Sequence, residues 1–549
     1  MKTIWQLLVL LLLVTPSVVF AQTNNSAATH VVDIGYAKYE GILNNQTGNL
    51  EFLGMRYAAS PTGDLRWREP QLPKETPGIQ KANAFPNRCW QGAEGNSSTS
   101  PFPSSAKSMI NSNQRRAAVP DFSEDCLFLN VFTPNPNAND LPVVVWIHGG
   151  GYALGSATGF EGFDIYDGND LIRAAGGRIV AVTIQYRLGA LGFLAGQKVH
   201  DEGALNAGLL DQQFAFQWVQ RHIHKFGGNP HQVTIWGQSA GAGSVLLHIV
   251  ANGGNTQPPL FRAAMTSSAS LSSLFRYNDR IPEQIYATFV NATGCSPAKD
   301  SLQCLRNADI KDIQQANIKL GVSAFFGIFT FIPVIDGRLF EKRPTQLLRE
   351  GKLNGEALLS FTNSNEGFLF VDQNDTAVQV PQYIANLYPT FHDRQITAAT
   401  AQYKDLGAPL SQVTAIVSES IFLCPAYFLL RAFKNKGFEA ELAVPPANHG
   451  DDLGYYFPGP INRPTLNDTR FIDNFAQSFM NFVMTMDPNK KWDSGNTVPH
   501  WDRWSKNGRL EMVFNRTEAG EPVIRSTRTN GDLLERCNFW ESVSQFSAQ

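Results

Sequence analysis

Apolar residues in this chain form short runs that are followed at once by glycine-rich or polar segments. Three of these runs predict buried strands: 143–147 (VVVWI), 233–236 (VTIW) and 357–361 (ALLSF). Residues 242–250 follow the second run closely and predict a helix. The chain around residues 233–250 is therefore predicted to form a strand, a sharp turn and a helix.

The turn between that strand and helix carries the motif GQSAG at 237–241, a G-x-S-x-G pattern. Its glycines would permit a turn too tight for neighbouring Cβ atoms. Ser239 would then stand above the sheet at a helix N-terminus, where the helix dipole favours developing negative charge. On its own the pattern is short and also fits a surface turn. With its flanking elements it makes Ser239 a candidate nucleophile.

A serine nucleophile needs a base, and in this arrangement the base follows an acid along the chain. Of the later histidines, His449 lies in a segment of loop composition, as a loop-borne base requires. His248 falls within the predicted helix after Ser239, and His392 and His500 fit solvated or capping positions better.

Two acidic residues are candidates for orienting that base. Glu366 comes just after the strand predicted at 357–361, where functional groups collect in open α/β sheets. Asp336 is the rival, although Asp-Gly after an apolar run is also an ordinary turn signal.

The strand predicted at 143–147 runs into HGGGY at 148–152. Consecutive glycines after a core strand let backbone N–H groups point into a pocket without side-chain obstruction. This segment is therefore predicted to form an oxyanion hole.

Taken together, these segments resemble the type-B carboxylesterase/lipase family, which includes fungal lipases, sterol esterases and cholinesterases. The matching segments span nearly the whole chain in family order: 124–131, the glycine run, 185–189, 226–230, the GQSAG turn, 331–337, and the segments around Glu366 and His449. The resemblance implies an α/β-hydrolase fold, that is, a large, mostly parallel central sheet flanked by helices, with a disulfide-closed lid loop.

The same resemblance implies the site residues. It implies a triad of Ser239, Glu366 and His449, and oxyanion donors at the amides of Gly150, Gly151 and Ala240. No metal or organic cofactor is implied. Gln238 departs from the family, which commonly has Glu before the nucleophile. Loss of that charge, together with a disulfide loop whose only tryptophan is Trp90, weakens the case for a cationic choline substrate.

The N-terminus predicts a secretory signal peptide over residues 1–21, because a short basic start precedes an apolar run at 7–14. Residues 22–549 are predicted to form a single catalytic domain. No later stretch is expected to be long and apolar enough to cross a membrane, so the protein is predicted to be extracellular and without a transmembrane anchor.

Six cysteines suit an oxidising compartment, and they allow fifteen pairings. The resemblance suggests the pairs Cys89–Cys126, Cys295–Cys304 and Cys424–Cys537. A metal site is the weak alternative, since no C-x-x-C spacing occurs. Sequons for N-glycosylation occur at seven positions: Asn24, Asn45, Asn96, Asn291, Asn374, Asn467 and Asn515.

The net charge of −3 argues against a nucleic-acid partner, which would need a basic face. Two segments bear on the substrate, and they point in different directions. The loop at 95–105 is rich in Ser and Asn, which suits a solvated loop as well as a lid that opens onto lipid. The segment at 324–332 is rich in aromatic residues, and its family position suggests a substrate pocket, although a Phe-rich run is also typical of a core. The pocket candidates are Phe325, Phe326, Phe329 and Phe331.

These observations predict a secreted serine hydrolase that cleaves bulky or hydrophobic carboxylic esters, with a lipid–water interface as an open alternative partner. Two other functions stay open. One is a feruloyl-type or short-chain esterase acting on soluble aromatic esters. The other, more remote, is a non-catalytic binding module, which the survival of serine, acid, base and glycine run disfavours.

Overall fold

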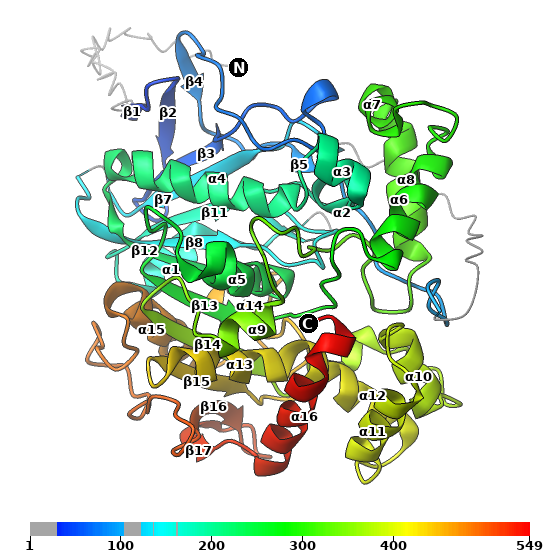
Figure 1. Cartoon of the computed structure of the whole chain (residues 1–549). Coiled ribbons are helices and arrows are strands. Elements are labelled where there is room, and N and C mark those ends of the chain that lie inside the picture. The colour runs from blue at the N-terminus through cyan, green and yellow to red at the C-terminus, as the bar shows by residue number, and fades with distance from the viewer. Residues whose placement is uncertain (1–29, 104–121, 136, 161–162) are drawn as a thin grey trace, which may run out of the picture.

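A large twisted sheet forms the centre of the protein (Figure 1). The computed structural model describes residues 30–103, 122–135, 137–160 and 163–549. The predicted signal peptide, Asn24 and the middle of the Cys89–Cys126 loop lie outside these residues. The strands of the sheet, in spatial order, are β1 (His30–Asp33), β2 (Lys38–Leu43), β3 (Leu50–Arg56), β7 (Phe128–Thr133), β11 (Val180–Ile184), β8 (Leu141–Ile147), β12 (Gly228–Gln238), β13 (Ala263–Ser267), β14 (Ala357–Asn363), β15 (Gly437–Leu442), β16 (Leu510–Arg516) and β17 (Pro522–Arg528), with β4 (Ile79–Lys81) beside β2.

The strands from β11 to β16 are all parallel. The pairs outside them are antiparallel, except for β2 with β4, which is parallel. Two short ribbons lie outside the sheet: β5 (Arg88–Cys89) with β6 (Phe122–Ser123), and β9 (Gly159–Phe160) with β10 (Phe163–Asp164). The predicted α/β-hydrolase architecture is confirmed by this sheet and by the helices around it.

The central strands are apolar on both faces because both faces are covered. In β8, Val143 and Val145 belong to one hydrophobic core, whereas Val144 and Trp146 belong to the other. This is why the sequence shows continuous apolar runs instead of alternation. The three predicted strands coincide with parts of β8, β12 and β14, and the predicted helix lies within α5 (Ala240–Val250).

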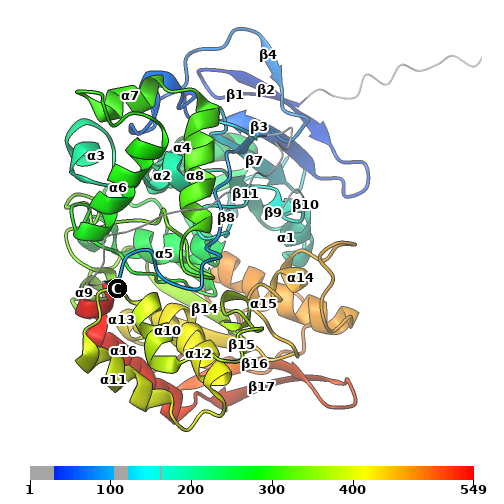
Figure 2. The ribbon, with the colours of Figure 1, turned by 90° about the vertical axis from the view of Figure 1, so that its right-hand side faces the viewer.

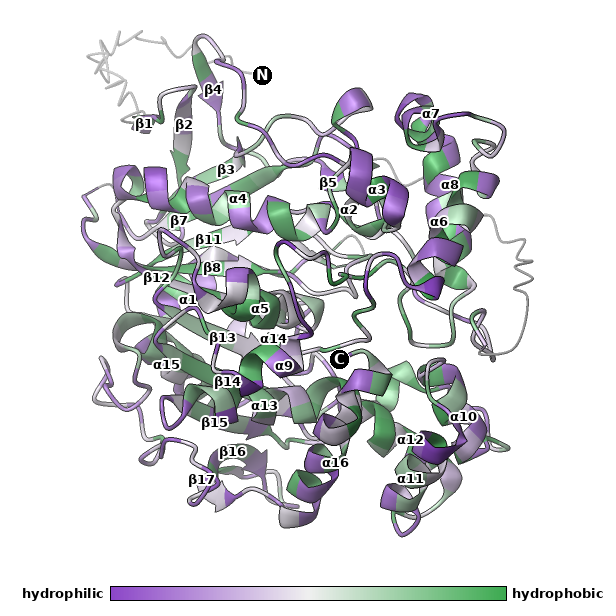
Figure 3. Ribbon diagram, viewed as in Figure 1, coloured by the Kyte–Doolittle hydropathy of each residue, from purple (hydrophilic) through white to green (hydrophobic). Residues whose placement is uncertain are grey.

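Figure 2 shows helices on both sides of the sheet. One side carries α4 (Ala207–His222), α5, α9 (Pro344–Arg349) and α13 (Cys424–Phe433), with α16 (Gly531–Ser547) packed outside α13. The other carries α1 (Gly168–Ala174), α14 (Leu453–Tyr456) and α15 (Thr469–Thr485). In Figure 3 the hydrophobic colour is concentrated on the central strands and on α5.

The remaining helices lie outside these two layers, and many of them surround the carboxyl ends of the parallel strands. They are α2 (Gly189–Phe193), α3 (Gln197–Glu202), α6 (Arg280–Ala292), α7 (Ser301–Asn307), α8 (Ile310–Val322), α10 (Val380–Leu387), α11 (Asp393–Tyr403) and α12 (Pro409–Val417). A π-helix, η5 (Ser418–Leu423), joins α12 to α13.

Three disulfides join Cys89 to Cys126, Cys295 to Cys304 and Cys424 to Cys537, which is the pairing that the resemblance implies. The third links α13 to α16, 113 residues apart in sequence. Closing so long a loop restricts the unfolded chain, which is one way in which a disulfide stabilises a fold.

One helical stretch, Pro409–Phe433, is long and apolar enough to cross a membrane by length and composition alone. The expectation that no such stretch follows the N-terminus was therefore wrong on composition. The stretch is apolar because 83% of its most hydrophobic window is buried inside the protein, as in a core helix.

Buried carboxyl groups gather where β15 and β16 pair. Glu439 and Glu511 precede the paired residues Ala440 and Met512 on these neighbouring strands. Glu439 is 1% exposed, and burial, reinforced by Glu511, raises its pKa well above the ordinary value. Burial also raises the pKa of Glu511 to about 7, although Thr529 and Tyr427 donate hydrogen bonds to it. Glu441, on β15, adds further negative charge.

This cluster predicts a loss of stability as pH rises. The folded state binds protons that the unfolded chain releases near pH 4.5, so the contribution of Glu511 is complete below that pH and lost as pH approaches 7. We expect the free energy of unfolding to fall by on the order of 3 kcal/mol from Glu511 alone between pH 4 and pH 8. Glu511→Gln should flatten this dependence in denaturant titrations, whereas Glu518→Gln, at an exposed turn of the same hairpin, should not. Equal slopes in all three proteins would contradict the assignment.

Candidate active site

Ser239 sits at the sharp turn between β12 and α5, with φ 57° and ψ −124°. Few non-glycine residues adopt a positive φ, so this strained conformation must be held by its surroundings. The Ser239 amide donates to Ser267 O on β13 at 2.9 Å, and Ser270 Oγ donates to Ser239 O at 3.1 Å. A Cβ at Gly241 would lie 2.1 Å from Ile147 O, which explains that glycine of the motif.

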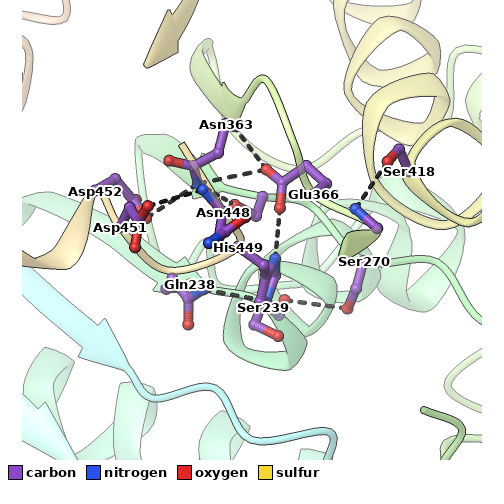
Figure 4. A network of polar contacts seen from close by, with 12 residues as sticks. Gln238, Ser239, Ser270, Asn363, Glu366, Ser418, Asn448, His449, Asp451 and Asp452 are labelled. Carbon is purple, nitrogen blue, oxygen red and sulfur yellow. Dashed lines mark hydrogen bonds and ion pairs between the residues drawn. The ribbon is translucent and has the colours of Figure 1, made fainter. Parts of the chain in front are cut away.

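His449 and Glu366 meet at the carboxyl edge of the sheet (Figure 4). Nδ1 of His449 lies 2.5 Å from Oε2 of Glu366, whose side chain is fully buried, while that of His449 is 9% exposed. The other carboxylate oxygen of Glu366 accepts a hydrogen bond from the Asn363 amide at 2.7 Å. A fully buried carboxylate with these partners can fix the orientation and tautomer of an imidazole.

Backbone pairing brings the two loops together. The loop after β14 forms a bridge with the histidine loop, in which the Asn365 amide donates to Ala447 O at 2.9 Å. The side chains of Asn365 and Asn448 add a hydrogen bond at 3.0 Å. Glu366 and His449, which are 83 positions apart, are thus brought together by hydrogen bonds between their two loops.

The structure places the rival residues elsewhere. Asp336 accepts hydrogen bonds from the amides of Arg338 and Phe340 and so closes its own turn. His248 is buried in α5 against Gln212, and burial lowers its pKa to about 3. His392 caps α11, and the side chain of His500 is 74% exposed.

The glycine loop lies over Ser239. Gly150 and Gly151 have φ values of 101° and 61°, in the region that favours glycine. A Cβ at Gly151 would lie 2.2 Å from the ring of Phe329. Gly151, Ser239 and Ala240 line one cavity, so amides at the end of the loop and at the N-terminus of α5 border the same space. This arrangement suits stabilisation of an oxyanion formed at Ser239.

His148, at the start of the glycine loop, packs against Tyr186. It is 1% exposed, its ring stacks on Tyr186 with centroids 4.4 Å apart, and Tyr186 Oη donates to His148 O at 2.9 Å. Burial lowers the pKa of His148 to about 4, so the ring is neutral above that pH.

Ser239 lines one cavity, and a second cavity adjoins it. Counting the space that is open to solvent, the first has about 410 Å³ and the second about 890 Å³. The wall common to both is formed by Ser272, Ile328, Phe329, Ile332 and Ile421. In the described part of the chain, no charged side chain lines either cavity.

The aromatic segment divides between cavity and core. Phe329 lines both cavities, and Phe325 lines the larger one. Phe331 instead packs against Phe289 in the core, and Phe326 is among the lining residues of neither cavity. The disulfide loop is tied to this segment, since the Ser97 amide donates to Ala324 O at 2.9 Å.

The aromatic side chains beside His449 were not predicted from the sequence. Phe422, on the π-helix η5, has its ring centroid 4.6 Å from that of His449, and the ring of Phe370 is 5.0 Å away. Ser418, on the same π-helix, accepts a hydrogen bond from the Gly367 amide next to Glu366. No periodicity in the sequence indicates the extra residue of a π-helix, which often marks a functional site.

A second buried acid, Asp452, was also missed. It is completely buried, and Asn363 Nδ2 donates to its Oδ1 at 3.2 Å. Burial, reinforced by the nearby Glu366, raises the pKa of Asp452 to about 7. Asp451 beside it is partly buried and accepts a hydrogen bond from the Asn448 amide.

Within the described residues, no cluster of three or more His, Cys, Asp or Glu side chains could hold a metal ion.

Known proteins are similar to this chain over most of its length. A family model described as the carboxylesterase family matches residues 28–540. A secreted lipase of Arthroderma benhamiae is 31% identical over 442 residues, which is 76% of this chain and 83% of that protein. Carboxylesterase patB of Penicillium expansum is 29% identical, covering 97% of this chain and 98% of its own length. The crystal structure of Aspergillus niger EstA has a TM-score of 0.82 and 31% identity, covering 95% of this chain and 99% of EstA.

The Glu366–His449 contact predicts how the two acid candidates differ. Glu366→Gln keeps the shape but allows the wrong imidazole tautomer, and we expect kcat for an activated ester to fall by about 10³–10⁴-fold. Asp336→Asn should leave kcat close to that of the unmodified protein, because the hydrogen bonds of Asp336 go to its own turn and to the side chain of Asn206. Initial rates with p-nitrophenyl butyrate test both. Comparable losses in the two variants would count against Glu366 as the acid.

Proposed function

This chain belongs to the carboxylesterase family and hydrolyses carboxylic esters, and we propose that it is a secreted serine esterase for esters with bulky, apolar acyl groups. The reaction proceeds through an acyl-enzyme on Ser239. The observation that carries the substrate class is the pair of adjoining cavities beside Ser239, which have no charged side chain among their described lining residues. Apolar walls with few polar groups are what a hydrophobic substrate requires.

In the proposed mechanism, His449 accepts the Ser239 proton as Oγ attacks the ester carbonyl. The resulting oxyanion accepts hydrogen bonds from the amides of Gly150, Gly151 and Ala240. The imidazolium then donates its proton to the departing alcohol. Water, deprotonated by the same imidazole, attacks the acyl-enzyme and releases the acid. Glu366 stabilises the imidazolium in both halves of the reaction.

The acyl group is proposed to occupy the cavity of about 410 Å³ and, when long, to pass Phe329 into the cavity of about 890 Å³. Support comes from the common wall, whose members are mostly aliphatic or aromatic. A chain that fills both spaces would remove considerable apolar surface from water, at about 25 cal/mol per Å².

A substrate panel tests the class of ester. We expect kcat/KM to rise from p-nitrophenyl butyrate to p-nitrophenyl palmitate, with triolein and a sterol oleate also hydrolysed and methyl ferulate poor. Ser239→Ala, and enzyme treated with an alkyl phosphonate, should lose activity on all of them by several orders of magnitude. A preference for butyrate or ferulate with no rate increase at an interface would replace this substrate class with soluble esters.

Phe329 offers a sharper test of the path. Phe329→Ala removes the ring common to both cavities, and we expect the ratio of kcat/KM for palmitate over butyrate to change by about tenfold in favour of palmitate. Phe326→Ala is the matched control, because Phe326 lines neither cavity, and its ratio should match that of the unmodified enzyme. An unchanged ratio in Phe329→Ala would refute the path.

The alternative of a feruloyl-type or short-chain esterase is favoured by one observation, the Ser- and Asn-rich composition of residues 95–105. Such a loop has little apolar surface to bind lipid. The substrate panel separates the two functions.

Secretion is supported by the N-terminal pattern of residues 1–21, by three disulfides and by exposed sequons. Asn45, Asn96, Asn291, Asn374 and Asn467 are exposed, whereas Asn515 is half-buried on β16. The exposed five are the proposed glycosylation sites.

A further inference from the structure

The loop that follows β13 forms part of the wall of both cavities beside Ser239. Hydrogen bonds fix this loop along its length. Ser270 Oγ donates to Ser239 O at 3.1 Å (Figure 4), and the amides of Leu271 and Leu274 donate to backbone oxygens of η5 and of the residue that ends α16, at 2.9 and 2.6 Å. Ser272 lies between these anchors, so the fold determines where its side chain stands.

Ser272 is the polar member of the wall that the two cavities have in common. The other described residues of that wall are aliphatic or aromatic: Ile328, Phe329, Ile332 and Ile421. Ser272 is half-buried, and within the described part of the chain its hydroxyl has no hydrogen-bond partner. A free hydroxyl therefore stands where an acyl chain would pass from the smaller cavity into the larger one.

The other serine and threonine hydroxyls that line the cavities already have protein partners. Ser270, Ser273 and Thr330 each donate to a backbone oxygen, and Ser100 accepts a hydrogen bond from a backbone amide. Apart from the nucleophile, Ser272 is thus the described serine or threonine of these walls whose hydroxyl is left for a ligand.

This hydroxyl would discriminate between acyl chains. A plain hydrocarbon chain that passes the common wall removes water from Ser272 and returns no hydrogen bond, which disfavours its binding. A chain with a hydroxyl at the matching position replaces that water, and the two hydroxyls satisfy each other because each can donate and accept. A few polar groups in an apolar pocket commonly set its specificity in this way.

We propose that Ser272 is a specificity-determining residue, and that it gives the enzyme a preference for esters of hydroxylated long-chain acids over esters of plain acids of the same length. The acyl hydroxyl binds Ser272 at the junction of the two cavities, while the hydrocarbon on either side of it contacts the apolar walls. This inference rests on the proposed function, in which the acyl group occupies these cavities.

The test compares p-nitrophenyl palmitate with a series of p-nitrophenyl hydroxypalmitates that carry the hydroxyl at successive positions, all in the same detergent. In the unmodified enzyme, kcat/KM for one position of the series should exceed that for palmitate by about tenfold, as one satisfied hydrogen bond allows. Ser272→Ala should remove this preference.

Two variants of equal shape isolate the hydroxyl. Ser272→Thr and Ser272→Val both add a methyl group to the passage, but only threonine keeps a hydroxyl, so the preference should persist in Ser272→Thr and be lost in Ser272→Val. If the added methyl stops hydrolysis of the long esters in both, the Ser272→Ala result decides.

The inference is overturned if the unmodified enzyme prefers no hydroxypalmitate to palmitate, if Ser272→Ala keeps the preference, or if active threonine and valine variants have equal ratios. Failure of the proposed function looks different, because the unmodified enzyme would then hydrolyse palmitate and every hydroxypalmitate poorly beside p-nitrophenyl butyrate.

Discussion

The strained backbone at Ser239 is the constraint on which the rest of the site depends. A positive φ at a serine is costly, and here it persists because the turn is fixed on both sides by hydrogen bonds to β13 and to the following helix. The turn also requires α5 to approach β8 so closely that only glycine fits at residue 241. The fully buried centre of the sheet supplies the rigidity, since β12 has parallel neighbours on both sides.

The other catalytic groups take their places from the same sheet. β14 lies two strands from β12 in the parallel register, so the loop that follows it ends at the edge where Ser239 stands. The loop with His449 follows β15, the next strand along, and pairs with the Glu366 loop through backbone hydrogen bonds. Acid and base therefore meet because consecutive parallel strands end at one edge of the sheet.

Much of this could be predicted from the sequence, because the signals are local. Continuous apolar runs identified β8, β12 and β14, and the spacing of glycines around Ser239 identified the turn. What could not be predicted depends on contacts between distant segments. The π-helix that brings Phe422 to His449 leaves no period in the sequence, and Phe331 differs from Phe329 only in where the fold places it. The burial of Glu439 and Glu511 could not be predicted from the sequence, because a glutamate in a strand is usually exposed and nothing local marks it as buried.

Charge is distributed unevenly across the imidazole of His449. Behind it lie Glu366, Asp451 and Asp452, and in front of it lie cavities without a charged side chain among the described lining residues. A neutral ester enters such a cavity at little electrostatic cost, whereas the carboxylate product is poorly solvated there and is repelled by the acids behind the base. The same arrangement that stabilises the imidazolium therefore favours release of the acid.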